Sequence, residues 1–449
     1  MIDIKLIREN RGLVRENIKK KLQDFKLPLV DEVRTLDENW RKLKTAADTL
    51  RAERNAVSKQ INEAKKAGQD ASELLKRAKI VPEQIDEIEK ESEALQAKIN
   101  EIMLQIPNIV SDDTPKGKDA SENKEIIRWG KIPRFKFPIK THVELAETNK
   151  LADFDASAKV SGNGFYYLKG DLALLDQALI RFAIDTMSKK SYEYIEPPLM
   201  LNEKSIFASM NKEAIAQSVY DIKDEDLHLI GTAEQSLLAM HSGTTFAEAE
   251  LPKKYFSYSM CFRKEVGSHG INEKGLWRTH QFNKVEQFIF CKPEESEKLY
   301  QELMKNSEGI LKALKLPYRV IEICSGDLAD WKYRSADLEV YRPTTQKYEE
   351  VMSLSNCTDY QARKLGIKYF NKKGERVIVH TLNDTALATS RIMVAILENN
   401  QQKDGTIKVP AVLVKYMNGR KVIGTSTKTK KEKKLNKKVK KGKHGRKKA

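Results

Sequence analysis

The first hundred residues carry apolar side chains at intervals that alternate between three and four positions. The first run consists of Val33, Leu36, Trp40, Leu43, Ala47, Leu50, Val57, Ile61 and Ala64. The second run consists of Leu74, Ala78, Val81, Ile85, Ile88, Leu95, Ile99, Ile102 and Ile106, with the polar Ser92 at a seam position. This heptad spacing is typical of helices that pack along a single seam. Because a polar stretch around Gly68 separates the two runs, the pattern predicts an antiparallel helical hairpin.

Each predicted helix would have about 35 residues and would be roughly 50 Å long at 1.5 Å per residue. A helix of that length with charged outer faces is not expected to be enclosed in a domain, so the hairpin should project into solvent. Pro82 should bend or interrupt the second helix, because proline removes a backbone donor and crowds the preceding turn. The outer faces carry the basic side chains of Lys42, Lys44, Arg51, Lys59, Lys65, Lys66, Lys76, Arg77 and Lys79.

The pattern changes after Pro107, where a stretch rich in Pro, Gly, Lys and Asp at 111–123 predicts a linker. Short β-rich runs follow at Tyr194–Pro198, Tyr255–Arg263, Gln281–Cys291, Tyr318–Cys324, Leu338–Tyr341, Val351–Ser355 and Val377–Leu382. Helical runs occur at Leu172–Met187, Glu294–Leu314 and Ala386–Asn400. Their irregular alternation predicts an α+β domain built on a mostly antiparallel sheet. We expect three parts: a helical arm at 1–108, this domain at 109–424 and a tail at 425–449.

The charge of the 449-residue chain is concentrated in the predicted tail. Of the net charge of +17, the segment Lys428–Lys448 carries +12, from twelve Lys and one Arg against one Glu. Such a basic segment with few apolar residues should be disordered. A solvated tail, a sequence-independent attraction to RNA phosphates and a nuclear address all remain open, because they share this composition.

Several classes of site are not supported by the sequence. The four cysteines are at least 30 positions apart and the seven histidines are scattered, so no zinc site is predicted. Neither an N-terminal leader nor an apolar run of about 18 residues is present, and we expect a cytoplasmic protein. Because G-x-G-x-x-G and P-loop motifs are missing, an ATP site would have to be built in another way.

The most informative segment is a predicted hairpin that begins at Phe262 and ends at Glu286. On this hairpin, Arg263 could hold a phosphate, and Phe282 could offer its ring to adenine. Strand alternation places Phe282, Lys284 and Glu286 on one face. A lone Arg-x-Glu pattern would more often mark a surface hairpin with ion pairs, whereas the complete spacing is much rarer.

That spacing resembles the second signature motif of the class II aminoacyl-tRNA synthetases: Phe-Arg-x-Glu, a loop, then Arg-x-x-x-Phe-x-x-x-Glu. The amino-acid sequence at 261–265 and 275–286 is similar to the seryl-tRNA synthetase version of the motif. The segment Glu196–Pro198 resembles the first motif, which lies at the dimer interface, and Asn383–Arg391 resembles the third motif at the start of a helix. The resemblance extends from residue 1 to about residue 420 and includes the helical arm, which is a tRNA-binding element in this family.

The resemblance implies a set of site residues. Serine would be bound by Thr232, Ala233, Glu234, Arg263, Glu286, Asn383 and Thr385. ATP would be bound by Arg263, Lys264, Glu265, Phe282, Glu350, Val351, Met352, Ser353 and Arg391. Glu350 and Ser353 would hold the ATP-bound magnesium, since hard oxygen ligands suit that ion, and Arg263 and Arg391 would be the catalytic residues.

Four positions depart from the family pattern, and two of them, Ala386 and Ala388, replace glycines of the general class motif. Met352 replaces a serine of the Glu-Val-Ser-Ser strand, so we expect the metal role to rest on Glu350 and Ser353. Asp384 stands where many members have glycine, and a carboxylate there could repel the substrates. We therefore expect Asp384 to point away from the site or to cap the following helix.

The implied reaction has two steps, formation of seryl-adenylate from serine and ATP and transfer of the seryl group to the 3′ end of serine tRNA. The implied partners are serine tRNA, L-serine and ATP, with selenocysteine tRNA as a further substrate, and the implied assembly is a homodimer. One rival is a non-enzymatic coiled-coil RNA-binding protein, but the set of motif residues argues against it. A second is a synthetase-like ligase that loads a protein carrier, but such homologues lack the long arm.

Overall fold

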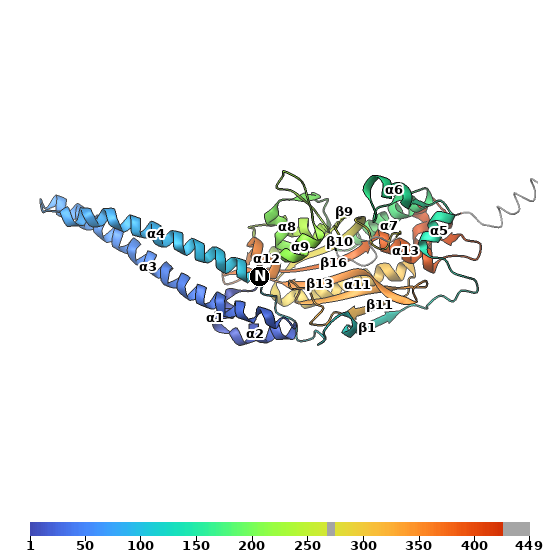
Figure 1. Cartoon of the computed structure of the whole chain (residues 1–449), viewed down its shortest axis with the longest axis horizontal. Coiled ribbons are helices and arrows are strands. Elements are labelled where there is room, and N and C mark those ends of the chain that lie inside the picture. Colours follow the sequence, from blue (N-terminus) through green and yellow to red (C-terminus); the bar gives the residue numbers. More distant parts are fainter. Residues whose placement is uncertain (267–273, 425–449) are drawn as a thin grey trace, which may run out of the picture. The chain divides into compact units, whose positions relative to one another are not determined.

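The computed structural model describes residues 1–266 and 274–424 (Figure 1). The chain folds into two compact units, Met1–Ile109 and Val110–Ala449. Within the described residues, no helix combines the length and the apolar character that a membrane span requires.

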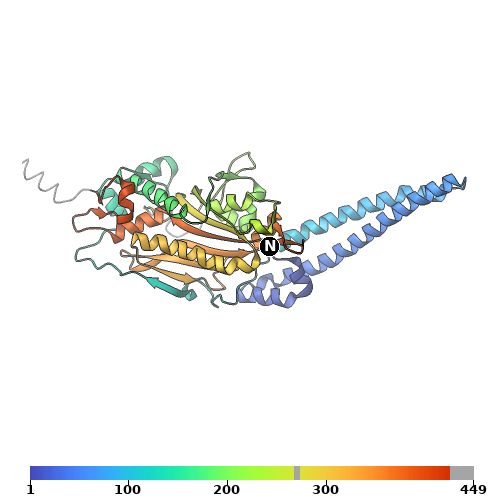
Figure 2. The same cartoon turned by 180° about the vertical axis from the view of Figure 1, so that it is seen from behind.

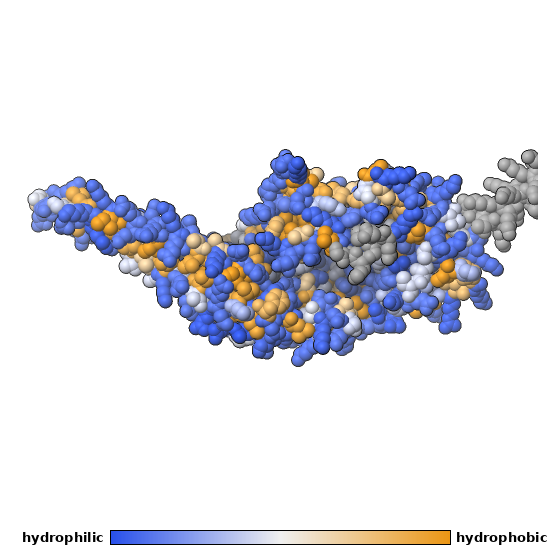
Figure 3. All heavy atoms as spheres, viewed as in Figure 1, coloured by the Kyte–Doolittle hydropathy of each residue, from blue (hydrophilic) through white to orange (hydrophobic). Residues whose placement is uncertain are grey.

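The first unit is entirely helical. It consists of α1 (Ile4–Glu9), α2 (Arg11–Lys20), η1 (Asp24–Lys26), α3 (Leu27–Lys66) and α4 (Ser72–Met103). The long helices α3 and α4 pack together and confirm the hairpin that the heptad spacing predicts. They have 40 and 32 residues, and Gly68 takes the left-handed conformation (φ +66°) in the turn that joins them. Polar residues cover most of the hairpin's surface in Figure 3.

Pro82 was predicted to bend or break the second helix, and the helix is not broken. Helix α4 runs without interruption from Ser72 to Met103 with Pro82 inside it. Val81 and Ile85 are both buried in the hairpin. We attribute the continuity of the helix to this packing, which compensates for the backbone hydrogen bond that the proline removes.

The hairpin is tied to the short helices at its base by Asp37. The Asp37 carboxylate, 2% exposed as a residue, accepts hydrogen bonds from Arg8 at 2.6 and 2.8 Å and from Arg41 at 3.0 Å. A buried carboxylate is stable only when it is paired in this way. Asp37 therefore joins α1 to α3 across 29 residues of sequence.

The second unit is built on one eight-stranded sheet with the order β1-β11-β12-β13-β16-β10-β9-β4. Every neighbouring pair is antiparallel except β4 and β9. The strands are β1 (Lys124–Trp129), β11 (Tyr318–Glu322), β12 (Arg334–Arg342), β13 (Lys347–Thr358), β16 (His380–Ala388), β10 (Gln281–Cys291), β9 (Lys253–Phe262) and β4 (Glu193–Tyr194). The predicted α+β class and the mostly antiparallel sheet are thus confirmed.

Three helices, α7 (Asp171–Met187), α11 (Ser296–Leu314) and α13 (Thr389–Asn399), pack against this sheet. Figure 2 shows α11 extended along one face of the strands. The apolar side chains of the sheet and the three helices form the largest core cluster of the protein. The opposite face of the central strands is left for the candidate site.

Smaller elements surround the sheet. The helices are α5 (His142–Thr148), α6 (Phe154–Ser161), α8 (Glu203–Ser209), α9 (Lys212–Ser218), α10 (Ala233–Ala239), α12 (Tyr360–Leu365) and the 3₁₀ turns η2 (Ala120–Glu122), η3 (Glu248–Glu250), η4 (Pro293–Glu295) and η5 (Ala411–Met417). The short strands are β2 (Ala152–Asp153), β3 (Tyr167–Leu168), β5 (Met200–Leu201), β6 (Tyr220–Asp221), β7 (His228–Leu229), β8 (Thr245–Ala247), β14 (Lys368–Phe370), β15 (Arg376–Ile378), β17 (Ile407–Lys408) and β18 (Val422–Ile423).

The strand expected at Tyr194–Pro198 is confined to β4 at Glu193–Tyr194, and two further predicted boundaries are wrong. The helix expected from Ala386 begins at Thr389, because β16 continues to Ala388. The strand expected at 377–382 is divided between β15 and β16. Both errors arise where buried apolar residues continue from one element into the next, so that hydrophobicity alone does not mark the boundary.

Candidate functional site

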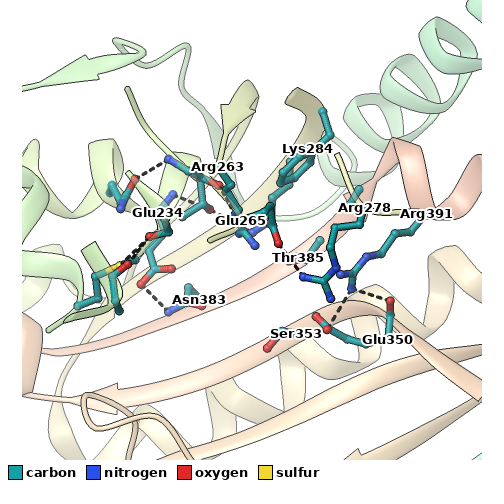
Figure 4. Close-up of a pocket in the computed structure, with 18 of the residues that line it drawn as sticks. Glu234, Arg263, Glu265, Arg278, Lys284, Glu350, Ser353, Asn383, Thr385 and Arg391 are labelled. Atoms are coloured by element: carbon teal, nitrogen blue, oxygen red, sulfur yellow. Dashed lines mark hydrogen bonds and ion pairs between the residues drawn. The ribbon is translucent and has the colours of Figure 1, made fainter. Parts of the chain in front are cut away.

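A cavity of about 450 Å³ lies on the face of the central strands opposite α11. Figure 4 shows charged side chains entering it from β10, β13, α10 and α13, and the uncharged polar side chains of Asn383 and Thr385 from β16. Most of the predicted site residues line the cavity, namely Thr232, Glu234, Arg263, Glu265, Phe282, Glu350, Val351, Ser353, Asn383, Thr385 and Arg391. Their roles in binding stay predictions, but the structure brings these residues together.

Arg263 and Phe282 face each other where β9 ends and β10 begins. The guanidinium carbon of Arg263 lies 5.2 Å from the centroid of the Phe282 ring, and its Nε donates to the Gly231 carbonyl at 3.2 Å. A cation beside an aromatic ring is held by the ring's quadrupole. This pair presents a flat ring and a positive charge side by side, a combination that suits a nucleotide.

Glu265 and Arg278 stand at the two ends of the loop between these strands. The Arg278 Nη1 lies 2.6 Å from the Glu265 carboxylate. Glu265 adopts a left-handed backbone (φ +52°), which is uncommon for a side chain other than glycine or asparagine. The ion pair connects the two ends of the loop, and Arg278 also lines the cavity.

Arg391, in the first turn of α13, is paired with Glu350 on β13. Its Nη1 lies 3.0 Å from the Glu350 carboxylate and donates to the Glu350 carbonyl at 2.8 Å. Burial opposes ionisation of Glu350, but the charge and hydrogen bond of Arg391, together with the charges of Arg263 and Lys332, outweigh it and lower the pKa of the carboxyl below its ordinary value. Glu350 is therefore an anion at neutral pH.

A β-bulge sets the direction of the neighbouring side chains. Leu338 pairs with Met352 and Glu339 pairs with Glu350, so Val351 is an extra residue on β13. Glu350 and Ser353 consequently face the same cavity although they are three residues apart. Met352, in contrast, is 1% exposed and belongs to the apolar core. The Met352 side chain therefore does not face the cavity, and its assignment to the ATP site stays a prediction.

Glu350 and Ser353 are suitable magnesium ligands, because both present oxygen atoms to the cavity. Asp337 lies opposite Ser353 in the β12–β13 ladder. Burial, and then the charge of Glu350, raise the pKa of Asp337 to about 7. Among residues 1–266 and 274–424, however, no three His, Cys, Asp or Glu side chains cluster as they would around a metal ion. The two oxygen donors fit a cation whose other ligands come from a bound phosphate.

The other end of the cavity is lined by Thr232 and Lys284, and Glu286 is buried next to Lys284. Thr232 is the N-cap of α10, and its hydroxyl lies 3.1 Å from the Lys284 ammonium. The same ammonium lies 2.5 Å from the Glu286 carboxylate. The strand alternation predicted for β10 is therefore correct for Lys284 and Glu286. Burial raises the pKa of Glu286 to about 7, although the charge of Lys284 opposes the shift.

Glu234 follows Thr232 in the first turn of α10 and enters the cavity beside Asn383 (Figure 4). Its Oε1 accepts hydrogen bonds from Gln361 at 2.7 Å and from Asn383 at 3.1 Å. Burial raises the pKa of the Glu234 carboxyl above its ordinary value. A carboxylate in this position is a strong acceptor for a cationic ligand.

Three other predicted site residues do not present a side chain to the cavity. The Lys264 ammonium lies 2.9 Å from Asp221, outside the cavity. Ala233 is fully buried at the start of α10. Glu286 is buried beneath Lys284 and is absent from the residues that line the cavity. The assignment of Lys264 to the ATP site stays a prediction, although its side chain is directed to Asp221.

Asp384 does not cap a helix, contrary to one of the two alternatives that its position allowed. It lies in the middle of β16 and is fully buried. Its side chain accepts hydrogen bonds from Gln287 and from Ser307 of α11, on the face opposite the cavity. The alternative that Asp384 points away from the site is correct, because strand alternation turns its neighbours Asn383 and Thr385 toward the cavity.

Several cavity residues were not predicted as site residues. These include Met210, Gln217, Ser218, Gln235, Trp277, Arg278, Thr279, Trp331, Lys332 and Ser355. Trp277, Arg278 and Thr279 lie within the motif segment 275–286, so the signal for them was present. Most of the others come from α8–α9 and from the segment before β12, which carry no short motif and reach the cavity only through the fold.

Two family models match the chain. A model described as the seryl-tRNA synthetase N-terminal domain matches residues 1–110. A model described as the tRNA synthetase class II core domain (G, H, P, S and T) matches residues 218–400. The two matches correspond to the helical unit and to the part of the second unit that contains the cavity.

Individual relatives match over nearly the whole chain. The serine–tRNA ligase of Methanocella arvoryzae is 45% identical over 421 residues, which cover 93% of this chain and 99% of that protein. The crystal structure of seryl-tRNA synthetase from Pyrococcus horikoshii complexed with ATP has a TM-score of 0.89 and 41% identity, and the match covers 94% of this chain and 99% of that one. The cytoplasmic serine–tRNA ligase from Naegleria fowleri in complex with AMP has a TM-score of 0.84 and 31% identity, with the same coverage.

Proposed function

Because the chain belongs to the seryl-tRNA synthetases, class II ligases that join serine to tRNA, we propose that its cavity binds ATP and serine side by side. The ATP end contains Arg263, Phe282 and Arg391, and the serine end contains Glu234 and Glu286. The observation that carries this assignment is that Arg263, Arg391 and Glu234 line one cavity, while Glu286 is buried and paired with Lys284, which also lines it.

At the ATP end, the Phe282 ring stacks on adenine and Arg263 contacts the α-phosphate. Arg263 already lies along the Phe282 ring, so a base on that ring and a phosphate on that guanidinium would be adjacent. Arg391 contacts the γ-phosphate. Glu265 borders the same end of the cavity and is oriented by Arg278.

Magnesium is held together with ATP by Glu350 and Ser353, the two oxygen donors on the β13 side of the cavity. When bound, the ion neutralises phosphate charge. Lys332 also lines this side of the cavity and adds a second positive charge near the triphosphate.

At the serine end, Glu234 accepts the substrate ammonium. Thr232, Asn383 and Thr385 surround it and line the same part of the cavity. Glu286 accepts a hydrogen bond from the serine hydroxyl, and the ion pair with Lys284 orients the Glu286 carboxylate. A buried carboxylate that loses its partner is costly, so alanine, which lacks the hydroxyl, would be rejected strongly.

The chemistry then requires positioning rather than a general base. The serine carboxylate oxygen forms a bond to the α-phosphorus while the bond to pyrophosphate breaks. Arg263 and Arg391 stabilise the negative charge on the phosphorus oxygens at this stage. In the second step a ribose hydroxyl of tRNA attacks the seryl carbonyl, and AMP leaves.

Residues 1–108 serve as the tRNA-binding arm. The seam of the hairpin is apolar, and its outer faces carry exposed lysines such as Lys59 and Lys76. Positive side chains on a long exposed surface suit the phosphate backbone of RNA.

Residues 109–424 carry the two chemical steps, and the tail from 425 lies outside the described residues. Selenocysteine tRNA stays a predicted second substrate.

The protein acts as a cytoplasmic homodimer. Apolar side chains on α7 and on the neighbouring strands β4 and β9 are exposed in the single chain, among them Leu174, Tyr194 and Met260, each 38% exposed. Exposed apolar residues that gather on one side of a protein often mark an interface. Light scattering at micromolar concentration measures whether the protein is a dimer. A monomer that stays fully active on dilution would contradict the proposed homodimer.

The assignment of the ATP end is tested by serine-dependent exchange of pyrophosphate into ATP. Arg263→Ala should lower the exchange rate by about a hundredfold or more, since one charged contact to a transition state is worth about 3 kcal/mol. Binding of serine tRNA should stay within a factor of about two. Exchange within about threefold of the wild-type rate would contradict the whole site assignment.

A further inference from the structure

Helix α12 carries two polar side chains that point into the protein and reach the same neighbouring helix. Gln361 is fully buried, and Lys364 is only partly exposed. Gln361 donates to the carbonyl of Ser209 at 2.9 Å, and Lys364 donates to the carbonyls of Phe207 and Met210 at 3.2 and 2.9 Å. These are carbonyls at the C-terminal end of α8, which the helix itself leaves without partners. We call Gln361 and Lys364 the α12 clamp.

Gln361 also contacts the proposed serine site. Its amide nitrogen donates to Oε1 of Glu234 at 2.7 Å, while its amide oxygen accepts from the Thr381 hydroxyl at 2.8 Å. The Thr381 hydroxyl therefore favours the amide orientation in which the NH₂ group faces Glu234.

The carboxylate of Glu234 is consequently held from one side. Gln361 and Asn383 both donate to Oε1. Within the described part of the chain, no hydrogen bond or ion pair is made by Oε2. A carboxylate fixed through one oxygen keeps the other available, in a defined direction, for a ligand that carries a positive charge.

Lys364 acts on the wall of the same cavity. The chain continues from the end of α8 through Met210 into α9, and Met210, Ala214, Gln217 and Ser218 line the cavity. A buried cation at the C-terminal end of a helix is favoured by the carbonyls that it meets there. Lys364 thereby fixes the position of Met210, the first of these cavity residues, and Gln361 connects the C-terminal turn of α8 to Glu234.

We propose that the α12 clamp is a positioning device for serine. Gln361 presents the second oxygen of Glu234 to the substrate ammonium. Lys364 holds the α8–α9 side of the cavity at the distance from Glu234 that serine requires. Neither side chain lines the cavity, so both act through other residues. The proposal rests on the assignment of Glu234 to the serine ammonium.

The test is steady-state pyrophosphate exchange with serine and ATP varied separately. Gln361→Leu removes one donor from Glu234, and it should raise KM for serine by about tenfold, the loss expected for one hydrogen bond to a charged group. KM for ATP should stay within about twofold, because the clamp touches none of the proposed ATP residues.

Gln287→Leu is the matched control. Gln287 is equally buried, and its side chain bonds to Asn306, Ser307 and Asp384 on the opposite face of the sheet. A general loss of packing would raise KM for serine in both variants, and this result would overturn the proposal. If Gln361→Leu does not fold, Thr381→Val replaces it, because it removes the hydroxyl that orients the Gln361 amide; unchanged KM for serine would then be the contradicting result.

A second measurement uses 3-hydroxypropionate, which has the hydroxyl and the carboxylate of serine but lacks the ammonium. Its inhibition constant should be the same for the wild type and Gln361→Leu within about twofold, while serine binding weakens. Equal weakening of both compounds would mean that Gln361 does not act through the ammonium. Lys364→Met should raise KM for serine at least about fivefold with ATP unaffected, and an unchanged value would remove Lys364 from the clamp.

Glu234→Gln separates this inference from the function on which it rests. If Glu234→Gln leaves KM for serine unchanged, the assignment of the ammonium site itself fails. If Glu234→Gln raises KM for serine but Gln361→Leu does not, the assignment stands and only the clamp is wrong.

Discussion

The guanidinium of Arg391 lies 3.0 Å from the carboxylate of Glu350, and it also donates to the backbone carbonyl of the same residue. The two groups that we propose for the γ-phosphate and for magnesium therefore orient each other at the cavity. Binding of ATP with magnesium would give each group a further partner of opposite charge.

Glu350→Gln should separate ATP binding from magnesium binding. The amide can still accept from Arg391 but offers a much weaker ligand to the ion. We expect pyrophosphate exchange to fall about a hundredfold, and the magnesium concentration needed for ATP binding in calorimetry to rise. Glu349→Gln is the control, because Glu349 pairs with Arg342 and does not line the cavity. An equal magnesium dependence in the two variants would contradict the metal assignment.

Glu286 should make serine activation dependent on pH near 7. Its pKa is raised to about 7 by burial, so the folded protein binds this proton more tightly than an exposed carboxyl does. Only the ionised form can accept the serine hydroxyl, and kcat/KM for serine should therefore fall as pH decreases from 8 to 6. Glu286→Gln should remove this inflection in exchange assays. An inflection that persists in the variant would mean that another group titrates.

The same shift affects stability in the opposite direction. Because the folded-state pKa of Glu286 is above the ordinary value, its contribution is fully present below about pH 4.5 and is lost as pH rises through 7. The melting temperature of the wild type should therefore decrease relative to Glu286→Gln between pH 5 and pH 8.

Glu398 should contribute to stability at neutral pH. Burial opposes its ionisation, but hydrogen bonds from His142 and Arg342 and one from Thr344 lower its pKa to about 2. A depressed pKa means that the contribution is present above about pH 4.5 and is lost as pH falls toward 2. Glu398→Gln leaves Arg342 without its buried partner, and we expect a loss of about 3 kcal/mol in the free energy of unfolding at pH 7.

Denaturant unfolding at several pH values checks this prediction. The difference between the wild type and Glu398→Gln should be largest near pH 7 and should shrink as pH falls below 4.5. A difference that does not change with pH would show that the loss comes from packing and not from charge.

Shortening the helical hairpin should separate the two chemical steps. Deletion of residues 44–90 with a short Gly/Ser bridge keeps Asp37 and its bonds to Arg8, and so keeps the base of the hairpin. Pyrophosphate exchange should be unchanged within about twofold, while kcat/KM for charging of serine tRNA should fall about a hundredfold or more.

The salt dependence of tRNA binding gives an independent readout of the arm. Removing phosphate contacts should flatten the decline of affinity with salt. Both the full hairpin and the shortened hairpin should be measured in chains that end at Gly424, because the basic segment 428–448 would otherwise add its own salt dependence. Near-normal charging by the shortened protein would show that the arm does not select tRNA.

Much of this protein was determined by its sequence alone. The heptad positions predict both long helices, because helical periodicity is a local property and each seam residue lies three or four positions from the next. The alternation along 281–291 correctly places Lys284 and Glu286 together, because β10 is continuous at these positions. The segment from Phe262 to Glu286 and the third motif supply many of the residues that line the cavity.

The direction of the remaining side chains was decided only by the tertiary structure. Met352 turns into the core and Ser353 toward the cavity because Val351 is an extra residue between paired strands, and pairing register is not encoded in either strand alone. Asp384 faces Ser307 instead of capping a helix because β16 continues through it. Gln361 and Glu234 are 127 residues apart and meet only when α12 packs beside α8 and α10. Contacts of this kind depend on how elements pack, and a pattern of neighbouring residues carries no information on which distant side chain will satisfy a buried polar group.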